Sequence, residues 1–386
     1  MSKPHPTLSE FLEGQDAESI CQPLKGNIVR ILHVNDMNQV EKTYQSELTK
    51  RGHSVKIYEP RFDGGLAPLP IKLALMPRRI LNFRHVIVNL NPDFFDIVHI
   101  HWASYGVLGL MSNIPFIVHC RGDDVRDRLN QPLFRPILTT ILRRAAAVMC
   151  ITPDLLPVVQ SVRSDVIFSP APIDTERFTP GESSPSTPWT VLLFARLDPD
   201  KGVDVTIKGI ARFAQRHPNV RVQLLDWGDL KGKYKREYAE SFEFVPTVTP
   251  GKVEQLIRSA NVIVGQLTLG ALGLSELQAM SCAKPVIASF RYGEAYPTPP
   301  PLCQASIAEE VVEHLEYLFQ HPEVVTTLGQ KGREWVIRYH DYRTLSDELE
   351  KIYRSIIERT GVSNLFQHKL SSYQPSVAYD PEEAQH

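Results

Sequence analysis

The sequence predicts an α/β protein with two domains, each built from a parallel β-sheet covered by helices. Three observations support this fold class. The chain has 386 residues, 42% of them hydrophobic, which is enough to form two sizeable cores. Short β-branched runs alternate with helical patterns, as is typical of parallel sheets. Between two such series lies the segment PGESSPSTP (180–188), whose proline and serine content predicts a linker.

The first predicted domain covers residues 27–179 and follows a polar, aperiodic appendage at 1–26. Its strands are expected at residues 27–34, 53–60, 95–102, 114–120 and 146–152. A helix is expected over 40–52, where Gly52 provides the usual C-terminal stop.

The second predicted domain covers residues 189–342, and a polar tail occupies 361–386. Its strands are expected at 189–195, 220–226, 241–246, 261–265 and 285–289, with helices over 203–217, 252–260 and 274–282. In doubly wound sheets, ligands bind beyond the carboxyl ends of the strands. We therefore expect two facing Rossmann-like domains with the ligand site in the cleft between them.

The composition argues against several classes of protein. A formal net charge of -2 and a pI near 6.7 provide no basic field, so no nucleic-acid partner is expected. The five cysteines are far apart and fit a reducing cytoplasm. The sequence has no apolar signal segment and no apolar run of about 18 residues. We expect a cytoplasmic protein whose contact with a membrane, if it has one, is peripheral.

Two common nucleotide-binding motifs are absent. The turn after the first predicted strand, VNDMNQV (34–40), has no glycine, which argues against a dinucleotide-binding dehydrogenase. The string GDLKGK (228–233) is one residue too short for a Walker loop, and Tyr234 replaces the Ser or Thr that would bind magnesium.

The most informative loop is LFARLDPDKGVDV (193–205), in which Arg196 follows a strand and Lys201 precedes the next helix. An arginine fork and a lysine charge near a helix N-terminus form a site suited to a diphosphate. The alternative is a solvated loop whose charges contact only water.

This loop resembles the GRL-x-x-x-KG signature of family 4 glycosyltransferases, with Ala195 in place of the glycine. Further stretches resemble the same family in the same order: FDIVHIHW (95–102), HCRGDDVR (119–126), SPAPIDTERFTP (169–180), LGLSELQAMSCAKPVIAS (272–289) and KGREWVIRYH (331–340). The resemblance covers roughly residues 27–360. It implies a GT-B fold, a nucleotide-diphosphate sugar as donor, retention of anomeric configuration, and no metal or cofactor. It also implies that a helix at 343–360 returns to the N-terminal lobe.

The resemblance assigns donor-binding residues in the second domain. Arg196 and Lys201 match the diphosphate contacts of the family, and Gly273, Leu274 and Ser275 match the turn whose amides contact phosphate. The string GQLTLGALG (265–273) is similar to a DQL-x-x-G-x-x-G pattern of a subgroup and adds Gln266 and Gly270. The family often has two glutamates eight residues apart here, and the matching positions are Gly270 and Gln278. Glu276 has no counterpart and is expected on an outer helix face.

In the first domain, the family usually has a histidine in an H-G-x-D pattern near the sugar. The matching string begins at Arg121 and ends at Asp124. Arginine cannot act as a base, but it can stabilise a departing phosphate or bind an acidic acceptor. His119 is expected to be a core histidine, whereas His101 either contacts substrate or packs at a strand end. His99 and His101 share a strand face, but no third ligand is apparent, so no metal site is expected.

Two alternatives remain open for the function. The replacements at Gly270, Gln278 and Arg121 favour a non-catalytic GT-B protein that binds a sugar nucleotide or acts as a scaffold. A sugar-nucleotide epimerase is less favoured, because the carboxylates and histidines that it needs around the sugar are scarce.

The acceptor is not identified and is expected to be a carbohydrate or lipid-linked molecule. Between Asp63 and Asp93 there is no acidic residue, while cations and apolar side chains alternate over 71–84. The cations are Lys72, Arg78, Arg79 and Arg84. Such a stretch can lie on an anionic bilayer, or it can be a core helix whose cations reach water.

Overall fold

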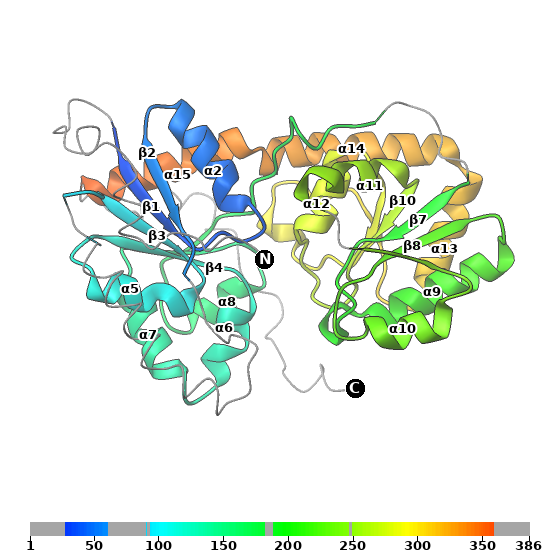
Figure 1. Cartoon of the computed structure of the whole chain (residues 1–386), viewed down its shortest axis with the longest axis horizontal. Coiled ribbons are helices and arrows are strands. Elements are labelled where there is room, and N and C mark those ends of the chain that lie inside the picture. The colour runs from blue at the N-terminus through cyan, green and yellow to red at the C-terminus, as the bar shows by residue number, and fades with distance from the viewer. Residues whose placement is uncertain (1–27, 61–89, 91–92, 182–187, 247–248, 359–386) are drawn as a thin grey trace, which may run out of the picture. The chain divides into compact units, whose positions relative to one another are not determined.

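The computed structural model describes residues 28–60, 90, 93–181, 188–246 and 249–358. The chain divides into two compact units, and each is described here by itself (Figure 1). The first unit draws on residues 1–151, 155–169 and 345–386, and the second on 152–154 and 170–344. Among the described residues, no helix has the length and apolar character needed to cross a bilayer. The basic segment 71–84 and most of the predicted linker lie outside the described residues.

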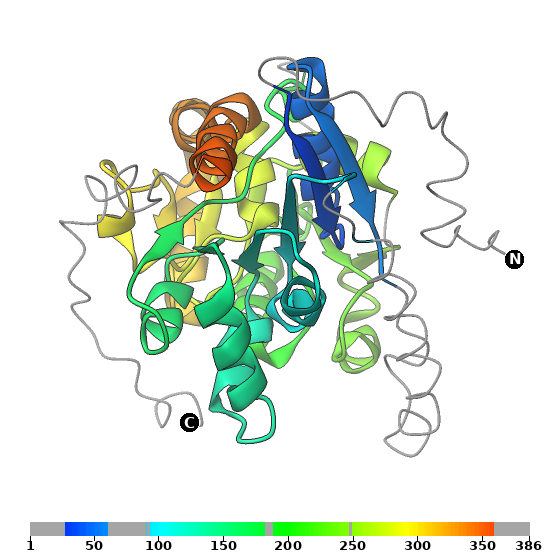
Figure 2. The same ribbon diagram turned by 90° about the vertical axis from the view of Figure 1, so that its left-hand side faces the viewer.

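The first unit is a six-stranded parallel sheet in the order β2-β1-β3-β4-β5-β6. Its strands are β1 Arg30–Val34, β2 Ser54–Tyr58, β3 Ile97–His101, β4 Phe116–Cys120, β5 Ala147–Cys150 and β6 Val166–Phe168. Its helices are α2 Val40–Lys50, α5 Gly106–Met111, α6 Asp123–Arg126, α7 Arg135–Arg144, α8 Leu155–Gln160, and most of α15 Tyr342–Ile357. Helices cover both faces of this sheet (Figure 2). Arg51, which follows α2, forms an ion pair with Asp347 of α15.

The second unit is also a six-stranded parallel sheet, in the order β12-β11-β10-β7-β8-β9. Its strands are β7 Thr190–Leu193, β8 Arg221–Leu225, β9 Glu243–Val245, β10 Val262–Val264, β11 Val286–Ala288 and β12 Cys303–Gln304. Its helices are α9 Val203–Arg216, α10 Lys231–Tyr238, α11 Val253–Ser259, α12 Leu274–Ser281, α13 Ala308–Gln320 and α14 Pro322–His340. The central strands β7 and β10 are entirely buried, which is why their sequences are nearly continuous apolar runs.

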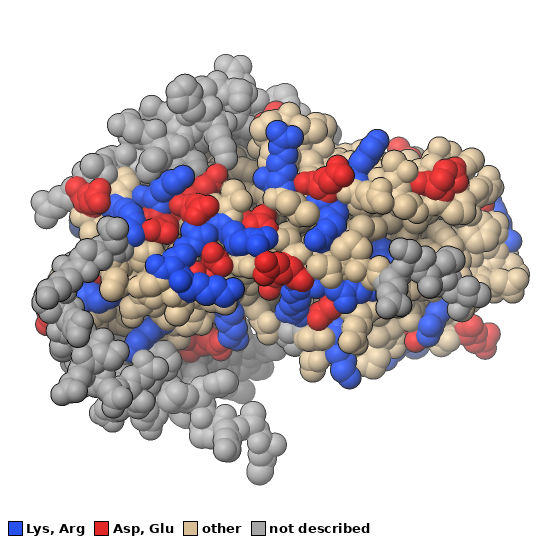
Figure 3. Space-filling model, turned by 90° about the horizontal axis from the view of Figure 1, so that it is seen from above, with Lys and Arg blue, Asp and Glu red and all other residues tan. Residues whose placement is uncertain are grey.

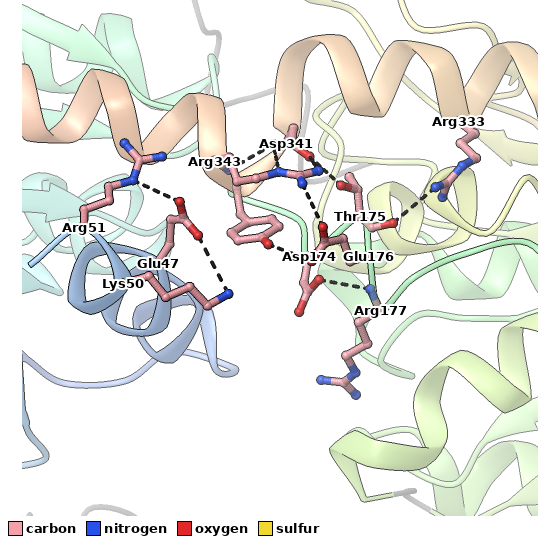
Figure 4. A network of polar contacts seen from close by, with 11 residues as sticks. Glu47, Lys50, Arg51, Asp174, Thr175, Glu176, Arg177, Arg333, Asp341 and Arg343 are labelled. Atoms are coloured by element: carbon pink, nitrogen blue, oxygen red, sulfur yellow. Dashed lines mark hydrogen bonds and ion pairs between the residues drawn. The ribbon is translucent and has the colours of Figure 1, made fainter.

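Most of the segment SPAPIDTERFTP (169–180) belongs to the second unit and has a structural role there. Arg343 pairs with Glu176 at 2.7 Å and with Asp341, between α14 and α15, at 3.2 Å (Figure 4). Arg333 of α14 donates hydrogen bonds to the carbonyls of Thr175 and Phe178.

On the face of the molecule in Figure 3, cations and carboxylates are intermixed, as the small net charge leads us to expect.

Each sheet has one switch point, at which successive connections leave in opposite directions. In the first unit it lies between β1 and β3, and in the second between β7 and β10. Loops that follow the two central strands diverge there and leave room for a ligand at the carboxyl ends. The polar loops discussed below lie at these two places.

Candidate functional site

The loop that follows β7 carries the two cations assigned to the donor diphosphate. The Arg196 side chain is 40% exposed, and its Nε lies 3.1 Å from the carboxylate of Asp198. The Lys201 Nζ lies 2.8 Å from the carboxylate of Asp200. Both charges are therefore paired within the loop rather than surrounded only by water. An anionic ligand that binds here competes with these carboxylates for the two cations.

The loops after β7 and β10 pack directly against each other at the switch point. The Leu267 amide donates to the Lys201 carbonyl oxygen at 3.1 Å. Gly202 has φ 68°, and a Cβ there would lie 2.3 Å from the Thr268 hydroxyl. Only glycine satisfies both the left-handed backbone and this close approach. The contact fixes Lys201 next to the loop that leads into α12.

Glu276 determines the geometry at the start of α12. Its carboxylate accepts hydrogen bonds from the Gln266 and Gly273 amides, each at 3.0 Å. The expectation that Glu276 lies on an outer helix face is wrong, because the side chain turns back to cap the helix and is 3% exposed. Burial raises the pKa of this carboxyl, while backbone hydrogen bonds and the charge of Lys201 act in the opposite direction.

The capping by Glu276 leaves two amides at the start of α12 for an anion. Among the described residues, neither the Leu274 nor the Ser275 amide donates a hydrogen bond. Both belong to the first turn, whose N–H groups have no partner within the helix. A phosphate oxygen placed there would also gain from the helix dipole.

The two departures from the family glutamates have different structural settings. Gly270 has φ 68°, and a Cβ would approach the Arg291 side chain to 2.9 Å, so a glutamate does not fit without rearrangement. Gln278 lies within α12 and is partly buried, so its backbone accepts any side chain. Gln266 is buried, and its side-chain amide donates to the Ala271 carbonyl of its own loop.

Two residues near this loop system were missed by the sequence analysis. Arg291 donates to the Thr268 carbonyl at 3.0 Å and adds a third cation beside the loop after β10. Trp227 follows β8, is 47% exposed, and has its ring 5.7 Å from the Arg196 guanidinium. A tryptophan after a strand looks like core from sequence alone, so only its exposure shows an available aromatic face.

At the switch point of the first unit, four histidines lie side by side on three strands. His33 is opposite His99, and His101 is opposite His119 in the strand register. All four are fully buried. Burial lowers the pKa of His33 to about 4 and lowers the pKa of the other three well below the usual value. The imidazoles are therefore neutral at physiological pH.

Three of these rings form a hydrogen-bonded chain. Arg121 donates to His101 Nδ1, and the His101 and His33 rings are joined at 2.7 Å from Nε2 to Nδ1. His33 Nε2 reaches the Tyr353 hydroxyl at 3.5 Å, and that hydroxyl lies 2.7 Å from His99 Nδ1. With Arg121 as the donor, each Nδ1 accepts and each Nε2 carries the proton. A proton on His101 Nδ1 would instead be donated to the Glu41 carboxylate, which lies 2.9 Å from that nitrogen.

The argument that no third metal ligand accompanies His99 and His101 is wrong. His33 supplies one from β1, and the ligand atoms of the three histidines lie within 4.8 Å of one another. With Arg121 as the donor, the hydrogen-bonded chain nevertheless occupies the single lone pair of each neutral ring. The Arg121 cation also touches His101. This arrangement favours a hydrogen-bonded cluster over a metal centre.

Arg121 is held by a carboxylate that the sequence analysis did not identify. Its Nη2 donates to Glu41, whose other oxygen accepts from the Met37 amide after β1. The side chains of Arg121 and Glu41 are 3% and 0% exposed. Nε and Nη1 of Arg121 have no hydrogen-bond partner among the described residues. Buried donors of this kind are available to an anionic ligand.

The remaining acceptor-side candidates have mainly structural contacts. Asp124 accepts from the amides of Ala103, Arg121 and Gly122, and joins the loops after β3 and β4. Burial raises the pKa of Asp124 to about 6. His119 forms a hydrogen bond with the Ser169 carbonyl at 3.2 Å within the core.

Trp102, next to His101, has φ 114°, an unfavourable backbone conformation of the kind found at functional sites.

Solved structures of other proteins share the fold of this chain. Sucrose-phosphate synthase from Thermosynechococcus elongatus has a TM-score of 0.68 at 16% identity, covering 86% of this chain and all of that one. Anabaena HepE in complex with UDP and glucose has a TM-score of 0.66 at 13% identity, covering 85% and 100%. The two parallel sheets with their polar loops have the GT-B fold of glycosyltransferases.

Two family models together run from residue 43 to residue 335. Residues 43–177 match Glycosyltransferase Family 4, and residues 174–335 match Glycosyl transferases group 1. The chain belongs to this glycosyltransferase family. It is 24% identical to the phosphatidyl-myo-inositol mannosyltransferase of Mycobacterium tuberculosis, over 84% of this chain and 92% of that protein. It is 23% identical to the alpha-monoglucosyldiacylglycerol synthase of Acholeplasma laidlawii, over 45% of each chain.

Proposed function

We propose that this glycosyltransferase transfers a sugar from a nucleoside-diphosphate sugar to an acceptor, with retention of anomeric configuration and without a metal ion. The diphosphate is placed at the switch point of the second unit. Arg196, Lys201 and the first-turn amides of α12 are its proposed partners, and Arg291 adds charge nearby.

One observation supports this proposal most directly. The hydrogen bond from Leu267 to Lys201 joins the cationic loop after β7 to the loop that begins α12. Cations and unpaired helix amides therefore belong to one packed loop system. Both kinds of group favour phosphate, and a site that uses them needs no divalent cation to neutralise the leaving diphosphate. The exposed face of Trp227 beside Arg196 suits a nucleobase or ribose.

The proposed reaction requires the enzyme to position the acceptor and the donor and to stabilise the charge of the departing diphosphate. The acceptor oxygen attacks the anomeric carbon on the face from which the diphosphate departs. The bond from that carbon to the diphosphate oxygen breaks, and a phosphate oxygen takes the acceptor proton. No side-chain base is required, which is compatible with arginine at position 121.

The acceptor is placed at the switch point of the first unit. Arg121 has two buried N–H groups without partners among the described residues, and these suit an anionic acceptor or the departing phosphate. The name of the first relative contains the lipid phosphatidyl-myo-inositol, and the name of the second contains the glycolipid monoglucosyldiacylglycerol. A lipid-linked acceptor is accordingly the proposed class.

The test combines ligand binding with product analysis. A thermal-shift screen with UDP, GDP and ADP identifies the nucleotide, because a ligand at a hundred times its Kd stabilises by about 2.7 kcal/mol. Turnover of the matching sugar nucleotides is then measured with and without candidate acceptors. Acceptor-dependent release of nucleoside diphosphate and a product with the donor's anomeric configuration are expected. Binding without turnover would indicate a non-catalytic protein, and interconversion of the sugars an epimerase.

A further inference from the structure

An exposed apolar tip lies where the chain enters α7 of the first unit. Leu133, Phe134 and Ile137 are 82%, 37% and 42% exposed, and all residues from 130 to 137 are exposed. Figure 1 shows α7 at the lower edge of this unit, and Figure 2 shows the same edge from the side. Pro132 and Pro136 lie on either side of Leu133 and Phe134 and restrict the backbone. Large apolar side chains grouped in this way mark a surface that contacts something apolar.

Within the chain segment that forms this tip, the charges have a single sign. Between Asp127 and Asp154 the sequence has no acidic residue, and it contains Arg128, Arg135, Arg143 and Arg144. Arg128 lies over the Phe134 ring at 5.4 Å, so a cation directly accompanies the apolar tip. Arg144 is seven residues from Ile137 on the exposed face of the same helix, which puts it on the same stripe.

A pocket of about 270 Å³ lies beside the tip. Its walls are mainly apolar, with Arg135 at the side, and the lining consists of Leu129, Asn130, Arg135, Pro157, Val158, Ser161 and Val162. An apolar recess with an adjacent guanidinium matches an amphiphile with an anionic headgroup better than it matches a soluble sugar.

We propose that the tip formed by residues 128–144, with its neighbouring pocket, docks onto the surface of an anionic lipid bilayer. The argument is charge complementarity: apolar side chains enter the headgroup layer while the arginines contact lipid phosphates. The residues of this surface do not include segment 71–84, and the proposal does not depend on the proposed reaction.

The test is vesicle co-sedimentation of the full chain. Vesicles of phosphatidylcholine alone are compared with vesicles of phosphatidylcholine and phosphatidylglycerol in equal parts. The wild-type protein should bind the anionic vesicles, and binding should fall as salt is raised. Arg135→Gln and Arg144→Gln should each weaken binding by about fivefold. The pair Leu133→Ser and Phe134→Ser should abolish most of it with the thermal midpoint unchanged, because both side chains are exposed.

Matched controls separate this surface from general effects. Lys208→Gln and Lys331→Gln remove exposed cations from the second unit, and Ile307→Ser removes an apolar side chain that is 51% exposed there. These variants should bind like the wild type. The proposal is overturned if the wild-type protein ignores anionic vesicles, or if the tip variants bind them as the wild type does. It is also overturned if the tip variants only lower the molecular mass in light scattering, because the surface would then join two copies of the chain.

Discussion

Arg121 donates a hydrogen bond to Glu41, and both side chains are buried, so the guanidinium at the position of the family histidine has a fixed counter-charge. Replacing Glu41 with leucine leaves a buried cation without its carboxylate. We expect a loss of about 3 to 5 kcal/mol in the free energy of unfolding. Denaturant unfolding measures this loss.

A double variant distinguishes the pair from simple loss of packing. Glu41→Leu combined with Arg121→Met removes both charges and should be more stable than Glu41→Leu alone. Glu309→Gln is the control, because this carboxylate forms an exposed ion pair with Arg212 and its loss should change little. A double variant that is less stable than the single one would contradict a compensated buried pair.

The two lost family glutamates should respond differently to restoration. Gly270→Glu requires a left-handed backbone and displaces Arg291, so we expect a loss of about 1 to 3 kcal/mol in stability and weaker donor binding. Gln278→Glu lies on a regular helix turn and should leave stability nearly unchanged. Thermal unfolding and donor binding of the two variants make the comparison. Equal tolerance at both positions would show that the backbone at Gly270 is not the reason for its glycine.

Stability should fall as the pH drops from about 6.5 to about 4. The pKa of His33 and that of His340 are each lowered from 6.5 to about 4, so in this window the unfolded chain binds more protons than the folded protein. Each such histidine contributes a slope of roughly 1.4 kcal/mol per pH unit. Asp124 changes the stability in the opposite direction. Its pKa is raised from 3.8 to about 6 in the folded protein, so its protonation stabilises the fold as the pH falls from about 6 to about 3.8.

His340 provides the test of this pH dependence. Its ring bonds to the Ala171 carbonyl at 2.9 Å and to the Tyr296 hydroxyl at 3.0 Å. His340→Gln should reduce the slope of stability between pH 6.5 and 4, whereas His321→Gln, at an exposed position, should not. Chemical denaturation at several pH values measures both slopes. Parallel curves for His340→Gln and the wild type would contradict the assignment.

The histidine cluster should hold no stoichiometric metal. A ring nitrogen of each histidine is hydrogen-bonded in the chain from Arg121 to His99. Elemental analysis of the purified protein should find substoichiometric zinc, and a chelator should leave sugar transfer unchanged. One zinc per chain that disappears in His33→Asn would show that the imidazoles bind a metal instead.

The sequence predicted the fold well because parallel strands buried on both faces are nearly continuous apolar runs. Strands β1, β3, β4, β7 and β10 all coincide with such runs. Strands β6 and β12, which have three and two residues, were not predicted. Helices α5 to α8, α10, α13 and α14 were also not among the predicted elements. The predicted domain boundaries, the cleft and the linker remain predictions.

The candidate site was predictable only where the signal is local. Arg196 and Lys201 belong to one loop motif, so the sequence alone placed them together. Glu276 was placed wrongly and Glu41 was missed, because each lies in the first turn of a helix and contacts a loop outside that helix. Helical periodicity does not indicate such a contact. The third imidazole, His33, depends on the register of β1 against β3, which the sequence does not contain.

The most direct test of the central claim is the affinity of the donor nucleotide for three variants, measured by calorimetry. Lys201→Ala removes a charge-assisted contact of about 1.5 to 3 kcal/mol and should weaken binding roughly 10- to 150-fold, and Arg196→Ala should behave similarly. Asp200→Asn removes the carboxylate that pairs with Lys201 at 2.8 Å and should strengthen binding instead. Unchanged affinity in both alanine variants would contradict a diphosphate site at the switch point of the second unit.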